Sequence, residues 1–320
     1  MTPILLPKPF FVLAPMDGVT DTVFRQIIAD CAKPDLFIIE FVNVDGLQSP
    51  GRGKLLHKLK FSAKEKPIIA QIWGKNPENF YKTTKELKKM GFGGIDLNFG
   101  CPVKAVVKNG CGAALINNRE LAGGIINRVK EACLPDRQAA GKDFPVSVKT
   151  RLGFDAVDLG WIEFLLGQKL NMLTIHGRTA KELSKTPANW EIFDKIREMR
   201  DKISPSTLIV GNGDVTSKFH GLKLAAQYSL DGIMIGRAVF DDPFVFSGAS
   251  PWNSYTKDQK IALYRQHVRL FAKTYKNNEL GIKTLNKFCK VYISGFDGAK
   301  ELRERLMKAN SAEELLTLLV

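Results

Sequence analysis

Long hydrophobic stretches are absent from this sequence. No apolar run approaches the roughly 18 residues that a membrane-spanning helix needs, so no membrane contact is predicted. Residues 1–9 are interrupted by proline and are too short for a secretory signal peptide. The sequence therefore predicts a cytoplasmic protein.

Cysteine and histidine are also scarce, with five cysteines and four histidines in 320 residues. The cysteines are scattered and odd in number, and no C-x-x-C pair occurs, which excludes zinc-ribbon spacing and a dithiol redox motif. This pattern is typical of the reducing cytosol. We therefore expect no bound metal.

Acidic residues are few relative to basic ones. The chain carries 47 Lys and Arg against 33 Asp and Glu, a formal net charge of +14. Such an excess suggests a polyanionic partner, most simply a nucleic acid; a generally basic surface without a specific partner is the alternative. A hydrophobic content of 44% in 320 residues suffices for a large core, in one domain or two.

Short apolar runs alternate with longer amphipathic segments, which indicates a parallel sheet with crossover helices. Most of the runs are almost entirely apolar, as in Leu208–Val210, which is typical of strands covered on both faces. We predict eight strands, at Phe11–Pro15, Asp35–Phe41, Pro67–Trp73, Gly93–Asn98, Pro145–Thr150, Met172–His176, Thr207–Asn212 and Asp231–Gly236.

Eight strand–helix units match the usual size of a (β/α)8 barrel, here residues 1–250; a doubly wound open sheet is the competing fold. The barrel is favoured because polar residues gather at the carboxyl ends of nearly every strand, where barrel enzymes keep their catalytic groups. The helices are predicted at Thr20–Cys31, Asn76–Met90, Asn118–Cys133, Val157–Gln168, Trp190–Met199 and Ser217–Tyr228.

The pattern changes after about Ser250, and no strand is predicted beyond it. Residues 251–320 read as a small all-helical domain in which basic residues outnumber acidic ones. This domain either binds RNA or is a packing appendage with a solvated charged face. Its helices are predicted at Thr256–Asn278, Leu280–Ile293, Ala299–Lys308 and Ala312–Leu319.

Cys101 follows the fourth predicted strand, on a turn rich in Gly and Pro and flanked by lysines. A free cysteine is usually a small apolar filler, but the Gly100–Pro102 turn and its basic surroundings favour chemistry on a negatively charged substrate. A thiol nucleophile would need an adjacent base, and the sequence identifies none. With a pKa near ~8.5 a thiol keeps its proton at neutral pH, so proton donation is the simpler role.

The last two predicted strands end in Gly211–Asp214 and Ile235–Arg237. Glycines let backbone N–H groups approach an anion, and Arg237 can add a forked, charge-assisted hydrogen bond. Because the loops after strands seven and eight form the usual phosphate site of a barrel, these endings predict a phosphorylated cofactor.

Three further polar residues stand near strand ends. Lys149 lies in a nearly apolar run and would be costly to bury alone, so it either contacts an electron-rich ring such as a flavin or forms a structural ion pair. His176 is a second candidate, or a satisfied core histidine. Gln71 could bond a flavin edge or merely cap a strand.

Taken in order, these segments resemble the tRNA-dihydrouridine synthase family over nearly the whole chain. The opening signature is Ala14–Asp21 with Phe24-Arg25, and the cysteine signature is Asp96–Pro102 with Lys104 and Lys108–Gly112. The remaining matches are Lys149–Arg151, His176–Thr179, Asn212–Asp214 and Ile235–Arg237. Asp17, Phe99 and Cys111 depart from residues common in the family, and none removes a functional group.

The resemblance implies an FMN-bearing barrel followed by a helical RNA-binding domain. NADPH would reduce the flavin, hydride would pass to uracil C6 in tRNA, and Cys101 would protonate C5. Asn98 would hold the uracil, and Arg151 and Arg178 are further candidates for substrate contacts. FMN would contact Pro15, Met16, Asp17, Gln71, Lys149, His176, Asn212, Gly213, Asp214, Gly236 and Arg237.

Other readings remain open at this point. A flavin barrel acting on a free pyrimidine, as in dihydroorotate dehydrogenases, would need no basic helical tail. An RNA-binding module without redox activity would have no use for Cys101. Ribosomal RNA is an alternative substrate, and no sequence feature indicates an obligate protein partner.

Overall fold

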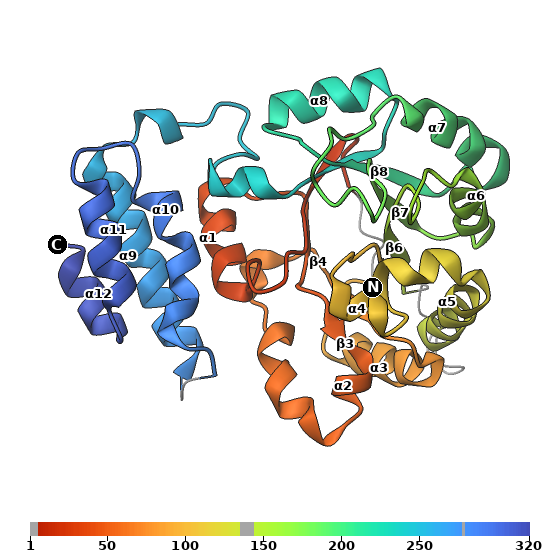
Figure 1. Ribbon diagram of the computed structural model, residues 1–320, viewed down its shortest axis with the longest axis horizontal. Coiled ribbons are helices and arrows are strands. Elements are labelled where there is room, and N and C mark those ends of the chain that lie inside the picture. Colours follow the sequence, from red (N-terminus) through yellow and green to blue (C-terminus); the bar gives the residue numbers. More distant parts are fainter. Residues whose placement is uncertain (1–5, 135–143, 277–278) are drawn as a thin grey trace.

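Parallel strands form one closed sheet in the computed structural model, which describes residues 6–134, 144–276 and 279–320 (Figure 1). Strand β2 pairs with both β1 and β4, which closes the sheet. Strand β3 follows β2 in the chain and also pairs with β4, so β2 and β3 together take one strand position of the barrel. The (β/α)8 barrel is confirmed, and the open-sheet alternative is wrong. The strands are β1 Phe10–Leu13, β2 Leu36–Ile38, β3 Val42–Asn43, β4 Ile68–Trp73, β5 Ile95–Phe99, β6 Val146–Arg151, β7 Met172–His176, β8 Leu208–Asn212 and β9 Gly232–Ile235.

The six helices predicted for the barrel are present, and local capping explains where they begin. Asn76 accepts a hydrogen bond from the Glu78 N–H, and Asn118 accepts one from Leu121, as expected for N-caps. The helices are α1 Thr22–Ala32, α3 Pro77–Lys89, α5 Arg119–Cys133, α6 Leu159–Gly167, α7 Ile192–Ile203 and α8 Lys218–Gln227. Two short helices, α2 Val44–Leu47 and α4 Lys104–Lys108, were not predicted.

The barrel interior is apolar on one side and polar on the other. Strand side chains alternate between the helix layer and the interior, and a separate apolar cluster fills one part of the interior: Phe10, Val12, Ala14, Leu36, Ile38, Ile69, Met172, Val210 and Met234. Strands β4 to β7 also place polar side chains inward, and pairing sets Gln71 beside Asp96 and Asp96 beside Ser147. One register step further, Asn98 lies beside Lys149. These buried polar groups require partners.

Beyond residue 250 the chain is helical, with one departure from prediction. Residues 280–293 were expected to form one α-helix, but Ile282–Phe288 is a 3-10 helix followed by the single-turn α10. Leu285 and Phe288, three residues apart, are both buried, which suits the three-residue turn of a 3-10 helix. The other helices are α9 Lys257–Thr274, α10 Cys289–Tyr292, α11 Ala299–Lys308 and α12 Ala312–Leu318. Residues 277–278, at the end of the helix predicted to reach Asn278, lie outside the described residues.

The helical segment packs directly on α1 of the barrel (Figure 1). The Phe24 ring on α1 lies 4.8 Å from the Phe288 ring and 5.9 Å from His267, between centroids. The Tyr275 hydroxyl donates a 3.1 Å hydrogen bond to Asp21, which caps α1. One continuous apolar cluster therefore spans both parts, and the domain division at residue 250 stays a prediction.

Tyr275→Phe removes only the hydroxyl that joins the helical segment to Asp21, and both residues are buried. Leaving a buried carboxylate with one partner fewer is expected to cost about 1–3 kcal/mol of unfolding free energy. Urea denaturation measures this cost. Tyr81→Phe is the matched control, because no described residue forms a hydrogen bond with its hydroxyl and its ring stacks on Arg128 instead. Equal stability of the two variants would contradict the prediction.

Candidate active site

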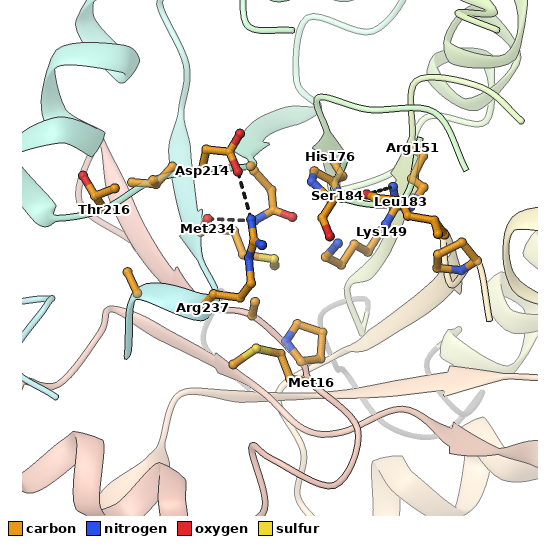
Figure 2. A pocket seen from close by; sticks show the side chains of 18 of the residues that line it. Met16, Lys149, Arg151, His176, Leu183, Ser184, Asp214, Thr216, Met234 and Arg237 are labelled. Atoms are coloured by element: carbon orange, nitrogen blue, oxygen red, sulfur yellow. Dashed lines mark hydrogen bonds and ion pairs between the residues drawn. The ribbon is translucent and has the colours of Figure 1, made fainter. Parts of the chain in front are cut away.

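A cavity of about 630 Å³ opens at the carboxyl ends of the strands (Figure 2). Its walls come from the loops after β1, β8 and β9 and from the ends of β6 and β7. Ten of its lining residues are candidates from the sequence: Pro15, Met16, Lys149, Arg151, His176, Asn212, Gly213, Asp214, Gly236 and Arg237. The barrel therefore gathers most of the predicted site residues around one space.

Five other candidates do not line this cavity. Asp17 forms an ion pair with Lys58. Gln71 and Asn98 lie buried in the barrel interior. Arg178 is 3% exposed and lies behind Asp214. Cys101 is partly buried, and its neighbour Pro102 reaches the cavity wall.

Sequence reasoning missed several lining residues on the surrounding loops. Leu183 and Ser184 come from the loop after β7, which has no periodic pattern that would single them out. Val215, Thr216 and Ala238 come immediately after the two predicted phosphate-binding endings, so their position along the chain could have indicated them.

Asp214 organises the cationic end of the cavity. Its carboxylate accepts hydrogen bonds from Arg178 and from the Ala188 N–H, the latter at 2.9 Å. It also accepts one from Arg237 at 3.0 Å (Figure 2). Partial burial opposes the charge of Asp214, but hydrogen bonds from Arg178 and Ala188 outweigh it and hold the pKa of Asp214 below its usual range. Arg237 remains 65% exposed, and its guanidinium has further N–H donors for an anion besides the one bonded to Asp214.

Position 213, next to these groups, has no room for a side chain. Its φ of +128° is a backbone conformation that favours glycine. A Cβ built there would lie 2.7 Å from the Ala188 Cβ and 3.1 Å from the His176 ring. Glycine is therefore required at this position by the backbone conformation and by the neighbouring side chains, and the expected approach of an anion stays a prediction.

Lys149 and His176 line the cavity wall next to this end (Figure 2). Burial, together with the charge of Arg151, lowers the pKa of Lys149 to about 8, and the charge of Asp96 opposes this shift. Burial and the charge of Lys149 hold the pKa of His176 far below its usual value, so this imidazole is neutral. Its Nε2 lies 3.1 Å from Arg178 Nη1 and accepts the hydrogen bond, since a guanidinium only donates.

Cys101 lies on a turn that is fixed from several sides. The Asn98 side-chain oxygen accepts hydrogen bonds from the N–H groups of Gly100 and Cys101, at 3.2 and 2.9 Å. The Ala113 N–H donates to the Cys101 carbonyl at 3.0 Å, and Arg151 Nε donates to the Gly100 carbonyl at 2.9 Å. The backbone of this turn is therefore held from both strands β5 and β6 and from the loop that follows.

The thiol of Cys101 is arranged to keep its proton. Burial raises its pKa above the usual value, and no described side chain forms a hydrogen bond with its sulfur that would activate it as a nucleophile. Cys111 is 3% exposed, and its sulfur donates to the Asn109 carbonyl. Of these two thiols, Cys101 is the accessible one.

Within the described residues no group of three or more His, Cys, Asp or Glu side chains could hold a metal ion. In the same part of the chain no helix has the length and apolar character to cross a membrane.

Comparison with solved structures supports the barrel. A 2-naphthoyl-CoA reductase complex superposes with a TM-score of 0.56 at 11% identity, over 78% of this chain and 50% of that chain. Histamine dehydrogenase from Rhizobium sp. 4-9 gives a TM-score of 0.53 at 14% identity, over 81% and 48%. At such low identity these matches show a shared fold only.

Comparison of sequences is more specific. A "Probable tRNA-dihydrouridine synthase" of Staphylococcus aureus (strain COL) is 43% identical over 98% of this chain and 93% of its own length. A "Probable tRNA-dihydrouridine synthase 2" of Bacillus subtilis (strain 168) is 41% identical over 98% and 94%. The family model for dihydrouridine synthase (Dus) matches residues 12–320. This chain therefore belongs to the dihydrouridine synthase family.

Proposed function

We propose that the protein is an FMN-dependent tRNA-dihydrouridine synthase that uses NADPH to reduce the C5–C6 double bond of uridines in tRNA. The observation that carries the proposal is one cavity with a cationic end, a lysine on its wall and a protonated thiol on the turn beside it. The names of the relatives supply the substrate class.

The cavity fits FMN on the chemistry of its walls. Gly213, Gly236 and Arg237 would hold the phosphate, because backbone N–H groups and a guanidinium suit that anion. Lys149 and His176 would lie along the flavin ring. The remaining contacts from the cavity wall would come from Pro15, Met16, Asn212 and Asp214. Gln71 and Asp17, which do not line the cavity, would lie further from the flavin. When bound, FMN would supply the hydride that reduces uracil C6.

The protein's own contribution is to orient the base and deliver a proton. Cys101 would donate its proton to uracil C5, a role that needs only a thiol that stays protonated. Asn98, on the strand that leads to Cys101, would hold the uracil, and Arg151 would fix the turn at its rim. Arg178 would hold the carboxylate of Asp214 in place through their ion pair and would not contact the substrate directly.

The RNA would be drawn in by charge. The net charge of +14 suits a polyanion, because phosphate contacts dominate affinity for nucleic acids. The basic helical segment 251–320 would supply part of that surface in the cytoplasm. A uracil must leave its stack in the RNA to enter this cavity.

The purified protein is expected to show the visible absorbance of an oxidised flavin and to lose it on adding NADPH. Incubation with unmodified tRNA should then yield dihydrouridine, which mass spectrometry detects and assigns to a position. Free uracil and ribosomal RNA serve as competing substrates. A colourless protein that FMN does not reconstitute, or reduction of free uracil in preference to tRNA, would contradict the proposal.

A further inference from the structure

A chain of hydrogen bonds crosses the polar side of the barrel interior and ends at the Cys101 turn. Gln71 Nε2 donates to Asp96 Oδ2 at 2.6 Å, and Asn98 Nδ2 donates to Gln71 Oε1 at 3.0 Å. Asn98 Oδ1 in turn accepts from the Cys101 N–H at 2.9 Å. Asp96 and Gln71 are fully buried and Asn98 is 6% exposed, so water does not replace these bonds.

Both ends of the chain demand the same orientation of the two amides. The Cys101 N–H can only donate, so it requires the oxygen of Asn98 and turns the Asn98 NH2 toward Gln71. That NH2 requires the oxygen of Gln71, which turns the Gln71 NH2 toward Asp96. An ionised carboxylate can only accept hydrogen bonds, so Asp96 is a suitable partner for the Gln71 NH2 at the end of the chain.

Asp96 is equipped to stay an acceptor. Burial raises its pKa to about 6, while hydrogen bonds from Gln71 and from Ser147 Oγ, the latter at 2.6 Å, oppose the rise. At neutral pH the carboxylate is therefore ionised, and it forms its hydrogen bonds with Gln71 and Ser147 rather than with Lys149.

We propose that Asp96 is a positioning residue of this active site, which acts through the amides of Gln71 and Asn98 to hold the Cys101 turn in place. The proposal rests on the proposed function for its catalytic meaning, since it concerns the residue that would deliver the proton. Removing the acceptor at position 96 leaves a buried NH2 unpaired, and either amide can relieve this only by turning. A turned Asn98 would present its NH2 to the N–H groups of Gly100 and Cys101, and the turn would move away.

Two substitutions separate the hydrogen-bond polarity from the charge. Asp96→Asn keeps an oxygen for Gln71 and offers its NH2 to Ser147, which can accept, so the chain keeps its polarity although the charge near Lys149 is lost. Asp96→Leu has no acceptor. In single turnover with tRNA we expect the rate of dihydrouridine formation to fall by roughly threefold or less in Asp96→Asn and by roughly tenfold or more in Asp96→Leu. The reason is that a small misplacement of a reacting group slows the reaction strongly. Flavin content and flavin reduction by NADPH, which do not use Cys101, should match the wild type.

Thr174→Val is the matched control. Thr174 Oγ1 is buried on β7 in the same barrel interior and has no hydrogen-bond partner among the described residues. Its loss should leave the single-turnover rate unchanged. A decrease equal to that of Asp96→Leu would mean that any polar change in the interior has this effect, and would overturn the proposal.

Two further measurements keep the test decisive. If Asp96→Leu does not fold, Gln71→Met cuts the same chain next to Asp96. Compared at equal flavin content, because Gln71 is also a proposed FMN contact, it should give the same loss of single-turnover rate. Mass spectrometry can follow the rate at which iodoacetamide alkylates Cys101. This rate should change several-fold in Asp96→Leu and Gln71→Met and little in Asp96→Asn, both with and without tRNA.

The outcomes for the two proposals are distinct. Wild-type protein that forms no dihydrouridine rejects the proposed function, while the alkylation rates still decide whether Asp96 positions the turn. Equal losses in Asp96→Asn and Asp96→Leu would assign the effect to charge and overturn the positioning role. Unchanged product formation and alkylation in Asp96→Leu would overturn it as well.

Discussion

Cys101→Ala is expected to lower dihydrouridine formation by roughly 10²- to 10⁴-fold, the usual contribution of a general acid. The reason is that the thiol is the accessible protonated group on the turn beside the cavity, and its raised pKa keeps the proton available at neutral pH. Bound flavin and its reduction by NADPH should persist, because the alanine removes no cavity wall. Single-turnover formation of product from reduced enzyme and tRNA measures the effect.

Cys111→Ala is the matched control for this variant. Cys111 is a buried thiol ten residues further along the same loop region, and its sulfur bonds only to the Asn109 carbonyl among the described residues. Its replacement should leave the rate close to that of the wild type. Product formation by Cys101→Ala at the wild-type rate, or a large loss in Cys111→Ala alone, would reject Cys101 as the proton donor.

Lys149→Met is expected to weaken FMN binding by roughly 10- to 150-fold, since hydrogen bonds to charged groups contribute about 1.5–3 kcal/mol. The pKa of this lysine is lowered to about 8, so the charged form that favours an electron-rich ring is lost as pH rises through that value. Affinity of the wild type for FMN should therefore be highest below about pH 8 and decline above it. Fluorescence titration of the flavin-free protein at several pH values measures both effects.

Lys130→Met provides the comparison for Lys149. Lys130, on α5, is a partly buried lysine whose pKa is also lowered by burial, but it bonds to the Gln168 carbonyl and does not line the cavity. Its replacement should change neither the affinity for FMN nor its pH dependence. Full flavin occupancy of Lys149→Met, or an unaltered decline above pH 8 in that variant, would remove Lys149 from the site.

The barrel could be predicted from the sequence because its strands are continuous apolar runs with polar residues at one end. Leu208–Val210 and Met172–His176 show this pattern, and each became a strand. The single α-helix expected over residues 280–293 was wrong, because local spacing does not distinguish the two kinds of helix. Leu285 and Phe288 suit either a 3-10 helix or an α-helix by spacing alone, and tertiary packing decided between them.

The candidate site could be predicted only at the positions that follow strand ends. Gln71 was correctly seen as a polar residue near a strand end, but its partners Asp96 and Asn98 depend on the register of β4 and β5, which no local pattern specifies. Arg25 illustrates the opposite case. It belongs to the opening signature, yet it is fully buried in an ion pair with Glu65 at 2.6 Å, so its role is to hold α1 against the neighbouring loop.

The packing of Phe24 against Phe288 and His267 has a consequence for exchange of parts between relatives. A chain cut after residue 250 would expose the Phe24 side of α1 to water and would be prone to aggregate. Residues 251–320 therefore cannot be exchanged between relatives without the helix they pack against. A soluble chimera of two relatives must take α1, α9 and α10 from the same parent protein.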